Sequence, residues 1–175
     1  AQCGGGDVAG GGDLIGGPFE LIQAQDEQLV TETEVIDGLT LMYFGYTFCP
    51  DVCPFDVSRN AEAVEILEER GIEIKPVMVT VDPYRDTPEV LANFTDAMHP
   101  RMVGLTGSDE QVEVAKLAYR AYGAKATEGE DYLVDHSTLS YLMHPEEGFL
   151  GFFRRDIGSE DMADRIACFA EAVDV

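Results

Sequence analysis

The sequence predicts one α/β domain with a central mixed β-sheet flanked by helices and an N-terminal β-hairpin. Between residues 39 and 122, three apolar strand-like runs alternate with three helical patterns, which is the order of a sheet whose strands are joined by covering helices. Hairpin patterns before and after this block add antiparallel strands to the sheet. A chain of 175 residues is long enough for one such core and short for two.

The N-terminal part divides into a tether and the start of the folded domain, which occupies residues 18–175. Residues 1–17 are rich in glycine and have no hydrophobic periodicity, so we expect a flexible tether. Two short β-like runs at 19–22 and 28–30 flank a polar turn and predict the hairpin. Residues 31–34 have the form of a capping box, which predicts a helical turn.

The central block supplies the middle of the predicted sheet. Its first strand is apolar on both faces, so we expect that strand at the centre. The predicted strands are 39–46, 74–81 and 102–105. The predicted helices run from the cysteine pair to Gly71, onward from Thr87 and Pro88, and from Ser108, in a capping box with Gln111, to Tyr122. Residues 123–135 are polar and acidic and predict a loop.

The C-terminal part predicts a second hairpin and a last helix. Residues 138–143 and 149–154 flank a turn at 145–148. Ser159 is expected to cap the last helix, and Cys168 lies on the apolar side of that helix, where we expect a buried small hydrophobe. An antiparallel pair backed by a C-terminal helix, after alternating strands and helices, is the thioredoxin-like arrangement.

The chain is strongly acidic, with a formal net charge of −23. This charge repels phosphates, so we expect no nucleic-acid partner, and it favours a basic patch on any protein partner. No run of about 18 apolar residues is present, so we expect no membrane span within this sequence. The first residue is Ala1, so a signal peptide or anchor removed before it would leave no trace here. Cys3, in the tether, is either a lipid attachment point, for which Gln2 is not the expected small neighbour, or an incidental thiol.

Cys49 and Cys53 form the most concentrated chemical feature of the sequence. They lie where the first long strand turns into a helix, and residues four apart share one helix face. The positive end of a helix lowers the pKa of a thiol, so both sulfurs are candidate thiolates. Such a pair can close a disulfide, chelate one metal ion or be inert, and proximity alone does not decide between these roles.

The spacing of the cysteines and a distant histidine favour a metal. Three residues separate the cysteines, whereas a thioredoxin redox motif has two, and the longer span suits two sulfurs that hold an ion between them. Thiolates select soft cations, above all Cu(I), with zinc as a competitor. His136 follows the acidic loop and would complete a set of two thiolates and one imidazole, although a surface histidine at a loop end is an equal alternative.

Three further polar residues carry weaker signals. Asp82 ends the second central strand, where it either lies beside the metal or forms an Asp-Pro turn. His99 is expected to be a capping cation at a helix end, and His144 to lie in the C-terminal hairpin turn. Neither histidine has a cysteine or an acid placed to complete a metal site.

Residues 44–54 closely resemble the signature of the Sco/SenC family, copper-binding assembly factors for cytochrome c oxidase. Three further stretches agree with that family in the same order: 81–88, 104–107 and 132–137. The resemblance extends from about Gly16 to the C-terminus. Phe48 departs from it, since many relatives have a polar residue there, and Cys3 and Cys168 are additional thiols.

The resemblance implies specific roles for four residues. The copper cysteines of the family correspond to Cys49 and Cys53, its copper histidine to His136, and the acidic residue near its metal to Asp82. It also implies a thioredoxin-like domain, anchored to a membrane in the full-length protein and located outside the cytoplasm, in the periplasm or facing the mitochondrial intermembrane space. The implied activity is delivery of copper, as Cu(I) or Cu(II), to the dinuclear CuA centre of oxidase subunit II, or reduction of the cysteines of that centre.

Three functions remain distinct at this stage. We favour a monomeric copper metallochaperone that uses Cys49, Cys53 and His136. The alternative is a thiol–disulfide oxidoreductase, an enzyme that cycles the Cys49–Cys53 disulfide against cysteines of the CuA site or of another extracytoplasmic partner and has little use for His136. A thiol peroxidase uses one activated cysteine with an arginine and a threonine, so the paired cysteines argue against it.

Overall fold

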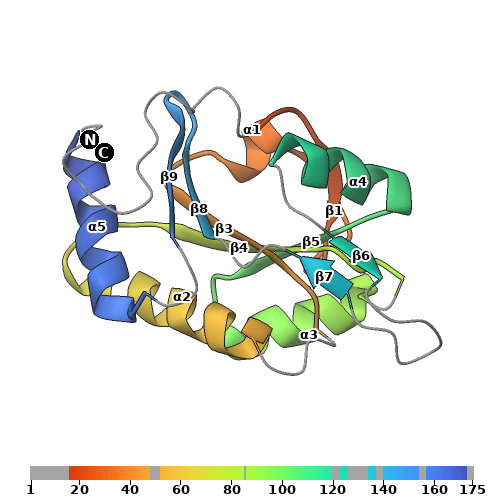
Figure 1. Ribbon diagram of the computed structural model, residues 1–175, viewed down its shortest axis with the longest axis horizontal. Helices are drawn as coiled ribbons and strands as arrows, with labels where there is room; N and C mark the ends of the chain where they lie inside the picture. Colours follow the sequence, from red (N-terminus) through yellow and green to blue (C-terminus); the bar gives the residue numbers. More distant parts are fainter. Residues whose placement is uncertain are drawn as a thin grey trace.

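The computed structural model of the protein describes residues 16–47, 52–84, 86–119, 123–125, 134–136, 140–153 and 157–172. For residues 52–54, 123–125, 134–136 and 172 it describes the backbone. These segments form a seven-stranded mixed sheet with helices on both faces (Figure 1). The predicted α/β, thioredoxin-like class and the N-terminal hairpin are confirmed.

The main sheet has the strand order β2-β1-β5-β4-β3-β8-β9. Its strands are β1 (Glu20–Gln23), β2 (Leu29–Thr31), β3 (Thr40–Gly45), β4 (Lys75–Thr80), β5 (Val103–Thr106), β8 (Ser140–His144) and β9 (Gly148–Phe153). β4 pairs in parallel with β3 and β5, whereas the hairpins β1–β2 and β8–β9 join this group antiparallel. β3 is buried along its whole length, as its continuous apolar run predicts.

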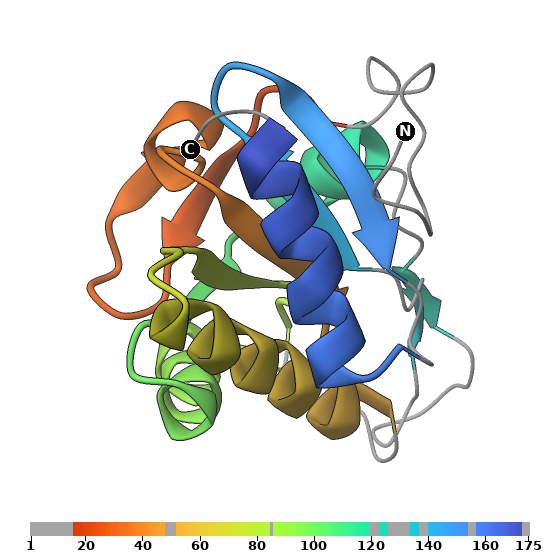
Figure 2. The same cartoon turned by 90° about the vertical axis from the view of Figure 1, so that its left-hand side faces the viewer.

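Helices cover both faces of this sheet. Within the described residues they are α1 (Glu32–Val35), α2 (Val52–Glu69), α3 (Pro88–Met98), α4 (Asp109–Ala118) and α5 (Ser159–Ala172). α2 and α3 lie below the sheet in Figure 1, and α1 and α4 lie above it. α5 packs across α2, with which it shares a buried cluster (Figure 2).

Leu41 and Phe44, which point to opposite faces of the sheet, lie in different buried clusters. Leu41 faces α2 and α5 and lies in a buried cluster with Ile166. Phe44 lies in the cluster on the other face, where its ring centroid is 5.5 Å from that of Tyr119 and 6.0 Å from that of Tyr141. Each such fully buried side chain contributes roughly 1.5–3 kcal/mol. β3 is therefore fixed from both sides before it leads into α2.

Two helix starts follow their local sequence signals. Thr87 caps α3, because its hydroxyl accepts a backbone N–H from the first turn, and Pro88 is the first helical residue. Ser108 and Gln111 form the capping box of α4, in which each side chain accepts the backbone N–H of the other. Both starts are as predicted.

The last helix starts differently. α5 begins at Ser159 itself, and the Met162 N–H donates to the Gly158 carbonyl at 2.9 Å. The Ser159 hydroxyl donates to Glu62 Oε1 of α2 at 2.7 Å. The predicted side-chain cap is thus replaced by a bond between two helices, which depends on a packing partner that the local sequence does not reveal.

A short ribbon occupies part of the stretch predicted as a loop. β6 (Gly123–Lys125) pairs antiparallel with β7 (Val134–His136), so that Gly123 lies opposite His136. The prediction of a loop over residues 123–135 is therefore wrong at both of its ends. Strands of three residues are too short for an alternating pattern to be read from the sequence.

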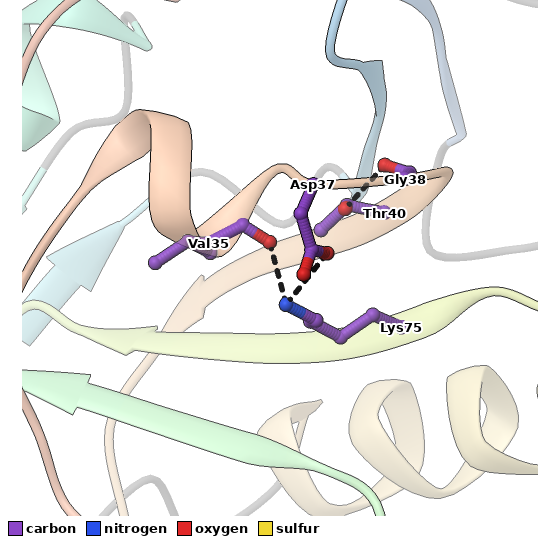
Figure 3. A network of polar contacts seen from close by, with 5 residues as sticks. All are labelled: Val35, Asp37, Gly38, Thr40 and Lys75. Carbon is purple, nitrogen blue, oxygen red and sulfur yellow. Dashed lines mark hydrogen bonds and ion pairs between the residues drawn. The ribbon is translucent and has the colours of Figure 1, made fainter.

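A polar network fixes the entry to β3 against the start of β4 (Figure 3). The Lys75 ammonium donates to the Val35 carbonyl at 2.8 Å and pairs with the Asp37 carboxylate at 3.0 Å. Beside it, the Thr40 hydroxyl donates to the Gly38 carbonyl at 2.9 Å. Because Lys75 begins β4 and Thr40 begins β3, these contacts hold together the amino ends of two central strands.

α3 lies close to β5 because Gly104 has no side chain. A Cβ added to Gly104 would lie 2.7 Å from Leu91 Cγ and 3.3 Å from Thr95 Cγ2. Ordinary contacts between carbon atoms are about 3.5–4.0 Å long. Gly104 therefore sets how tightly the first turns of α3, and the connection from β4 that precedes them, lie against the sheet.

Candidate functional site

The carboxyl ends of the three parallel strands meet at one edge of the sheet. Gly45 of β3 lies opposite Thr80 of β4, and the Val81 N–H extends this ladder to the Gly45 carbonyl at 2.8 Å. β5 ends at Thr106 on the other side of β4. In open α/β sheets, the segments that leave such strand ends form the ligand site. The segment that carries both cysteines of the motif and the segment that carries the predicted acid both leave from this edge.

The structure places two of the three predicted metal ligands at the backbone level. Cys53 is the second residue of α2, His136 is the last residue of β7, and Cys49 lies outside the described residues. Figures 1 and 2 both place the β6–β7 ribbon at the end of the sheet where β3 leads into α2. The backbones of Cys53 and His136, far apart in the sequence, therefore lie at the same end of the domain. Among the side chains that the structure describes, no group of three or more His, Cys, Asp or Glu residues is placed to hold a metal ion.

The start of α2 has a definite chemical character. The helix is 18 residues long, and the N–H groups of its first turn have no carbonyl partners within the helix. The positive end of the helix dipole favours the thiolate over the thiol for a cysteine at this position. A thiolate is the form needed both for binding a soft metal and for attacking a disulfide.

Asp82 begins the connection between β4 and α3. Its side chain is 4% exposed, its N–H donates to Thr80 Oγ1 at 2.9 Å, and its carbonyl accepts the Asp86 N–H at 2.9 Å. The backbone thus forms the turn that the Asp-Pro sequence predicts. The predicted place of the Asp82 carboxylate beside the metal stays a prediction.

Asp86 is the polar centre of this edge, and the sequence analysis missed it. It is fully buried, and its carboxylate accepts the Thr47 N–H at 3.0 Å, the Thr47 hydroxyl at 2.5 Å and the Thr80 hydroxyl at 2.7 Å. Its carbonyl accepts the Thr106 hydroxyl at 3.0 Å. The sequence signal for Asp86 is the presence of a threonine at or just beyond the end of each parallel strand, which is recognisable only once the strands are known to be adjacent.

The environment of Asp86 shifts its titration. Burial raises the pKa of the carboxyl group above its ordinary 3.8, the hydrogen bonds from Thr47 and Thr80 lower it in part, and the nearby charge of Asp82 raises it further. Burial is the largest of these effects. Ionisation of a buried carboxyl group costs free energy, and the hydrogen-bond donors around Asp86 offset part of that cost.

Two large aromatic side chains are exposed next to this edge. Phe55, in the first turns of α2, is 75% exposed, and Tyr84, in the connection between β4 and α3, is 81% exposed. Exposed aromatic residues beside a functional site are typical of surfaces that contact another protein.

The other two histidines have structural partners. His99 is the C-cap of α3, and its Nδ1 accepts the Arg101 N–H at 3.0 Å. His144 lies at the end of β8, and its Nδ1 accepts the N–H groups of Glu146 and Glu147, each at 3.1 Å. The turn role of His144 is as predicted. His99 caps its helix as predicted, and its Nε2 lies 3.8 Å from Glu68 Oε1 of α2.

Cys168, expected to be a buried small hydrophobe, is half-buried and disulfide-bonded. It lies on α5 one turn beyond Asp164, which pairs with Arg70 at 2.9 Å. Arg70 follows the end of α2, about 25 Å along the helix from Cys53 at 1.5 Å per residue. Bridged Cα atoms are at most about 7 Å apart, so Cys53 is not the partner of Cys168. The pairing of cysteines depends on tertiary placement, which the sequence pattern does not give.

The SCO1/SenC family model matches residues 8–171 of the chain. The chain belongs to the SCO1/SenC family. Among its relatives, Protein SenC of Rhodobacter capsulatus is 52% identical over 160 residues, which cover 91% of this chain and 72% of that protein. Protein SCO1 homolog 1, mitochondrial, of Arabidopsis thaliana is 40% identical over 154 residues, which cover 87% of this chain and 46% of that protein. The chain thus spans about half the length of the Arabidopsis relative.

Solved structures of SCO1/SenC proteins share this fold. The crystal structure of Arabidopsis thaliana ScoI with copper bound has a TM-score of 0.86 and 38% identity, covering 90% of this chain and 99% of that one. The crystal structure of yeast Sco1 with copper bound has a TM-score of 0.83 and 34% identity, covering 90% and 89%. Within the described part of this SCO1/SenC chain, no helix combines the length and the hydropathy that a membrane crossing requires.

Proposed function

We propose that this chain binds copper through the thiolates of Cys49 and Cys53 and the imidazole of His136, and that it acts as a copper metallochaperone in the assembly of cytochrome c oxidase. The observation that supports the proposal is that α2, which carries Cys53 in its first turn, begins at the end of the domain where the β6–β7 ribbon with His136 lies. The solved relatives from Arabidopsis and yeast have copper bound. Two thiolates and one imidazole form a donor set that suits copper.

The surroundings of this site suit a soft metal ion that is bound and then released. The start of α2 favours the thiolate form of the cysteine it carries. Asp82, buried two residues beyond the end of β4, acts beside the metal by orienting a ligand through its carboxylate. Binding of the ion needs no electron transfer, but it releases any proton that the thiols or the imidazole still carry, because the ligands are thiolates and a neutral imidazole.

The recipient we propose is the CuA centre of oxidase subunit II, reached by a monomeric domain on the extracytoplasmic side of a membrane. Residues 1–17 serve as the tether to a membrane anchor in the full-length protein. The exposed rings of Phe55 and Tyr84 flank the edge that carries the cysteines and offer an apolar surface to a protein partner. The net charge of −23 favours a partner with a basic face.

Anaerobic titration of the reduced protein with Cu(I) and Cu(II) tests this proposal. We expect one copper per monomer, Cu(II) binding weakened at least tenfold in His136→Ala, and transfer of the ion to an apo CuA domain. His144→Asn is the matched control, because this histidine has structural partners and an asparagine oxygen can accept the same N–H groups. If His136→Ala binds both copper states as wild type does, the three-ligand site is wrong.

A second candidate function is thiol–disulfide exchange, and the position of Cys53 at the start of α2 favours it as well. In this reaction the Cys49 and Cys53 dithiol is oxidised to a disulfide while a disulfide of the partner is reduced to two thiols, so two electrons and two protons pass to the partner. Reduction of an oxidised CuA domain that survives in His136→Ala and disappears in Cys49→Ser would support this function. Loss of both copper transfer and reduction in His136→Ala would exclude it as an independent activity.

A further inference from the structure

We propose that Asp86 is a positioning residue, which fixes the segment that enters the cysteine motif against the ends of β4 and β5. This inference rests on the proposed function for the identity of the ligands, but its physical basis is a set of contacts between described residues. We assign Asp86 a role that acts through Thr47, and we do not propose it as a copper ligand.

Asp86 holds the cysteine segment by hydrogen bonds to Thr47, which lies two residues before Cys49. The Thr47 N–H donates to Asp86 Oδ2 at 3.0 Å, and the Thr47 hydroxyl donates to Asp86 Oδ1 at 2.5 Å. Both oxygens of one carboxylate thus hold the backbone and the side chain of one residue. This two-point contact fixes the direction in which the chain leaves Thr47, as well as its position.

Asp86 is in turn fixed to both neighbouring strands. Its Oδ2 accepts the Thr80 hydroxyl at 2.7 Å, and its carbonyl accepts the Thr106 hydroxyl at 3.0 Å. Its N–H closes the turn to the carbonyl of Asp82 at 2.9 Å. The exit of β3, the end of β4, the end of β5 and the backbone of the predicted metal neighbour are therefore joined at one residue.

Fold stability alone does not explain a buried carboxylate at this position. Apolar residues of similar volume usually stabilise a buried site at least as well as charged groups do. Hydrogen-bonded groups behind metal ligands, in contrast, orient the ligands, and their loss typically lowers metal affinity by about 10–100-fold. A buried carboxylate at this edge is therefore explained by the geometry it imposes on the segment that follows Thr47.

Three variants separate positioning from general stability. Thr47→Val removes the hydroxyl that donates to Asp86 and keeps the side-chain shape, Thr47→Ser keeps that hydroxyl, and Asp86→Asn keeps the shape of the carboxylate without its charge. The control is Thr95→Val. Thr95 is also fully buried, and its hydroxyl donates to the Leu91 carbonyl and accepts from Gln25, about 10 Å along α3 from the start of that helix.

The test measures copper binding, the spectrum of the Cu(II) complex, and amide hydrogen exchange over residues 46–53 in the copper-free protein, each beside the melting temperature. We expect Thr47→Val and Asp86→Asn to bind Cu(I) about 10–100-fold more weakly, to shift the Cu(II)–thiolate absorption, and to exchange faster over 46–53. Thr47→Ser should restore all three properties. Thr95→Val should lower the melting temperature and leave all three unchanged.

Two results would overturn the inference. One is wild-type affinity, spectrum and exchange in both Thr47→Val and Asp86→Asn; the other is a loss that follows the melting temperature equally in Thr95→Val. If wild-type protein does not bind copper at all, the proposed function fails, while hydrogen exchange over 46–53 still decides whether Asp86 positions that segment.

Discussion

Substitution of Gly104 by alanine tests how closely α3 must lie against the sheet. The new Cβ would lie 2.7 Å from Leu91 Cγ and 3.0 Å from Leu91 Cδ2. Compared with an ordinary carbon contact of about 3.5–4.0 Å, the space is short by about 1 Å. α3 begins two residues after Asp86, so moving α3 away from β5 also moves the residue that holds the exit of β3.

The expected size of the effect follows from two opposing terms. Overpacking of a well-filled core costs about 1–3 kcal/mol. Replacing glycine by alanine restricts the unfolded chain, which returns about 0.4–1 kcal/mol. The net loss is therefore about 1–2 kcal/mol in the free energy of unfolding, equivalent to a fall of roughly 2–8 °C in the melting temperature of a domain of this size.

Urea denaturation of Gly104→Ala, Leu91→Ala and the double variant measures this. Leu91→Ala alone should cost about 2–5 kcal/mol because it leaves a cavity. In the double variant the new methyl group occupies space that the leucine has vacated, so the combined loss should be smaller than the sum by about 1 kcal/mol or more. A neutral or stabilising Gly104→Ala, or strict additivity in the double variant, would refute the close-approach argument.

Three further predictions concern Asp86, the disulfide and a helix cap. Burial raises the pKa of Asp86 above 3.8, so the folded state binds this proton more tightly than the unfolded state does. The stability that results is fully present below pH 3.8 and is lost as the pH rises through the pKa of Asp86 in the folded state. The unfolding free energy of wild type minus that of Asp86→Asn should therefore fall as the pH is raised from about 4 toward neutrality, and a difference independent of pH would contradict it. In a digest of unreduced, alkylated protein, Cys168 should be linked to a peptide other than that of Cys53, and a link between Cys168 and Cys53 would contradict this. Ser108→Ala should lower the free energy of unfolding by about 1 kcal/mol, because it opens the capping box of α4, and should leave the copper stoichiometry unchanged. Ser108→Thr should keep most of the stability. Equal losses in the two variants would show that the hydroxyl is not responsible.

The elements that the sequence predicts well are those whose signal is local. The continuous apolar run of β3 predicts a central strand, and the caps at Thr87 and Ser108 predict two helix starts to the residue. The two hairpins follow from β-rich runs around polar turns. In each case the residues that determine the element are within a few positions of it.

The features that escape prediction depend on residues distant in sequence. Asp86 stands directly before a helix cap, where an acid needs no special explanation, and its role appears only when the ends of three strands are adjacent. The bond of Ser159 to Glu62 and the disulfide of Cys168 likewise depend on which segments meet in space. The β6–β7 ribbon is too short to have a periodic signal.

The candidate site is predicted mainly by motif and resemblance. The structure adds that the backbones of Cys53 and His136 lie at one end of the domain, which neither spacing nor composition establishes. The ligand set of Cys49, Cys53 and His136 and the place of Asp82 beside the metal stay predictions that the proposed titrations test.

The hydrogen bonds around Asp86 join the exit of β3 and the ends of β4 and β5, and their donors are Thr47, Thr80 and Thr106. None of these donors is a residue that we propose as a copper ligand. Under the proposed function, loading and unloading of copper would therefore exchange bonds at the ligands and leave the bonds that join the strand ends in place. A partner that competes for the ligands could then remove the ion without opening the edge of the sheet.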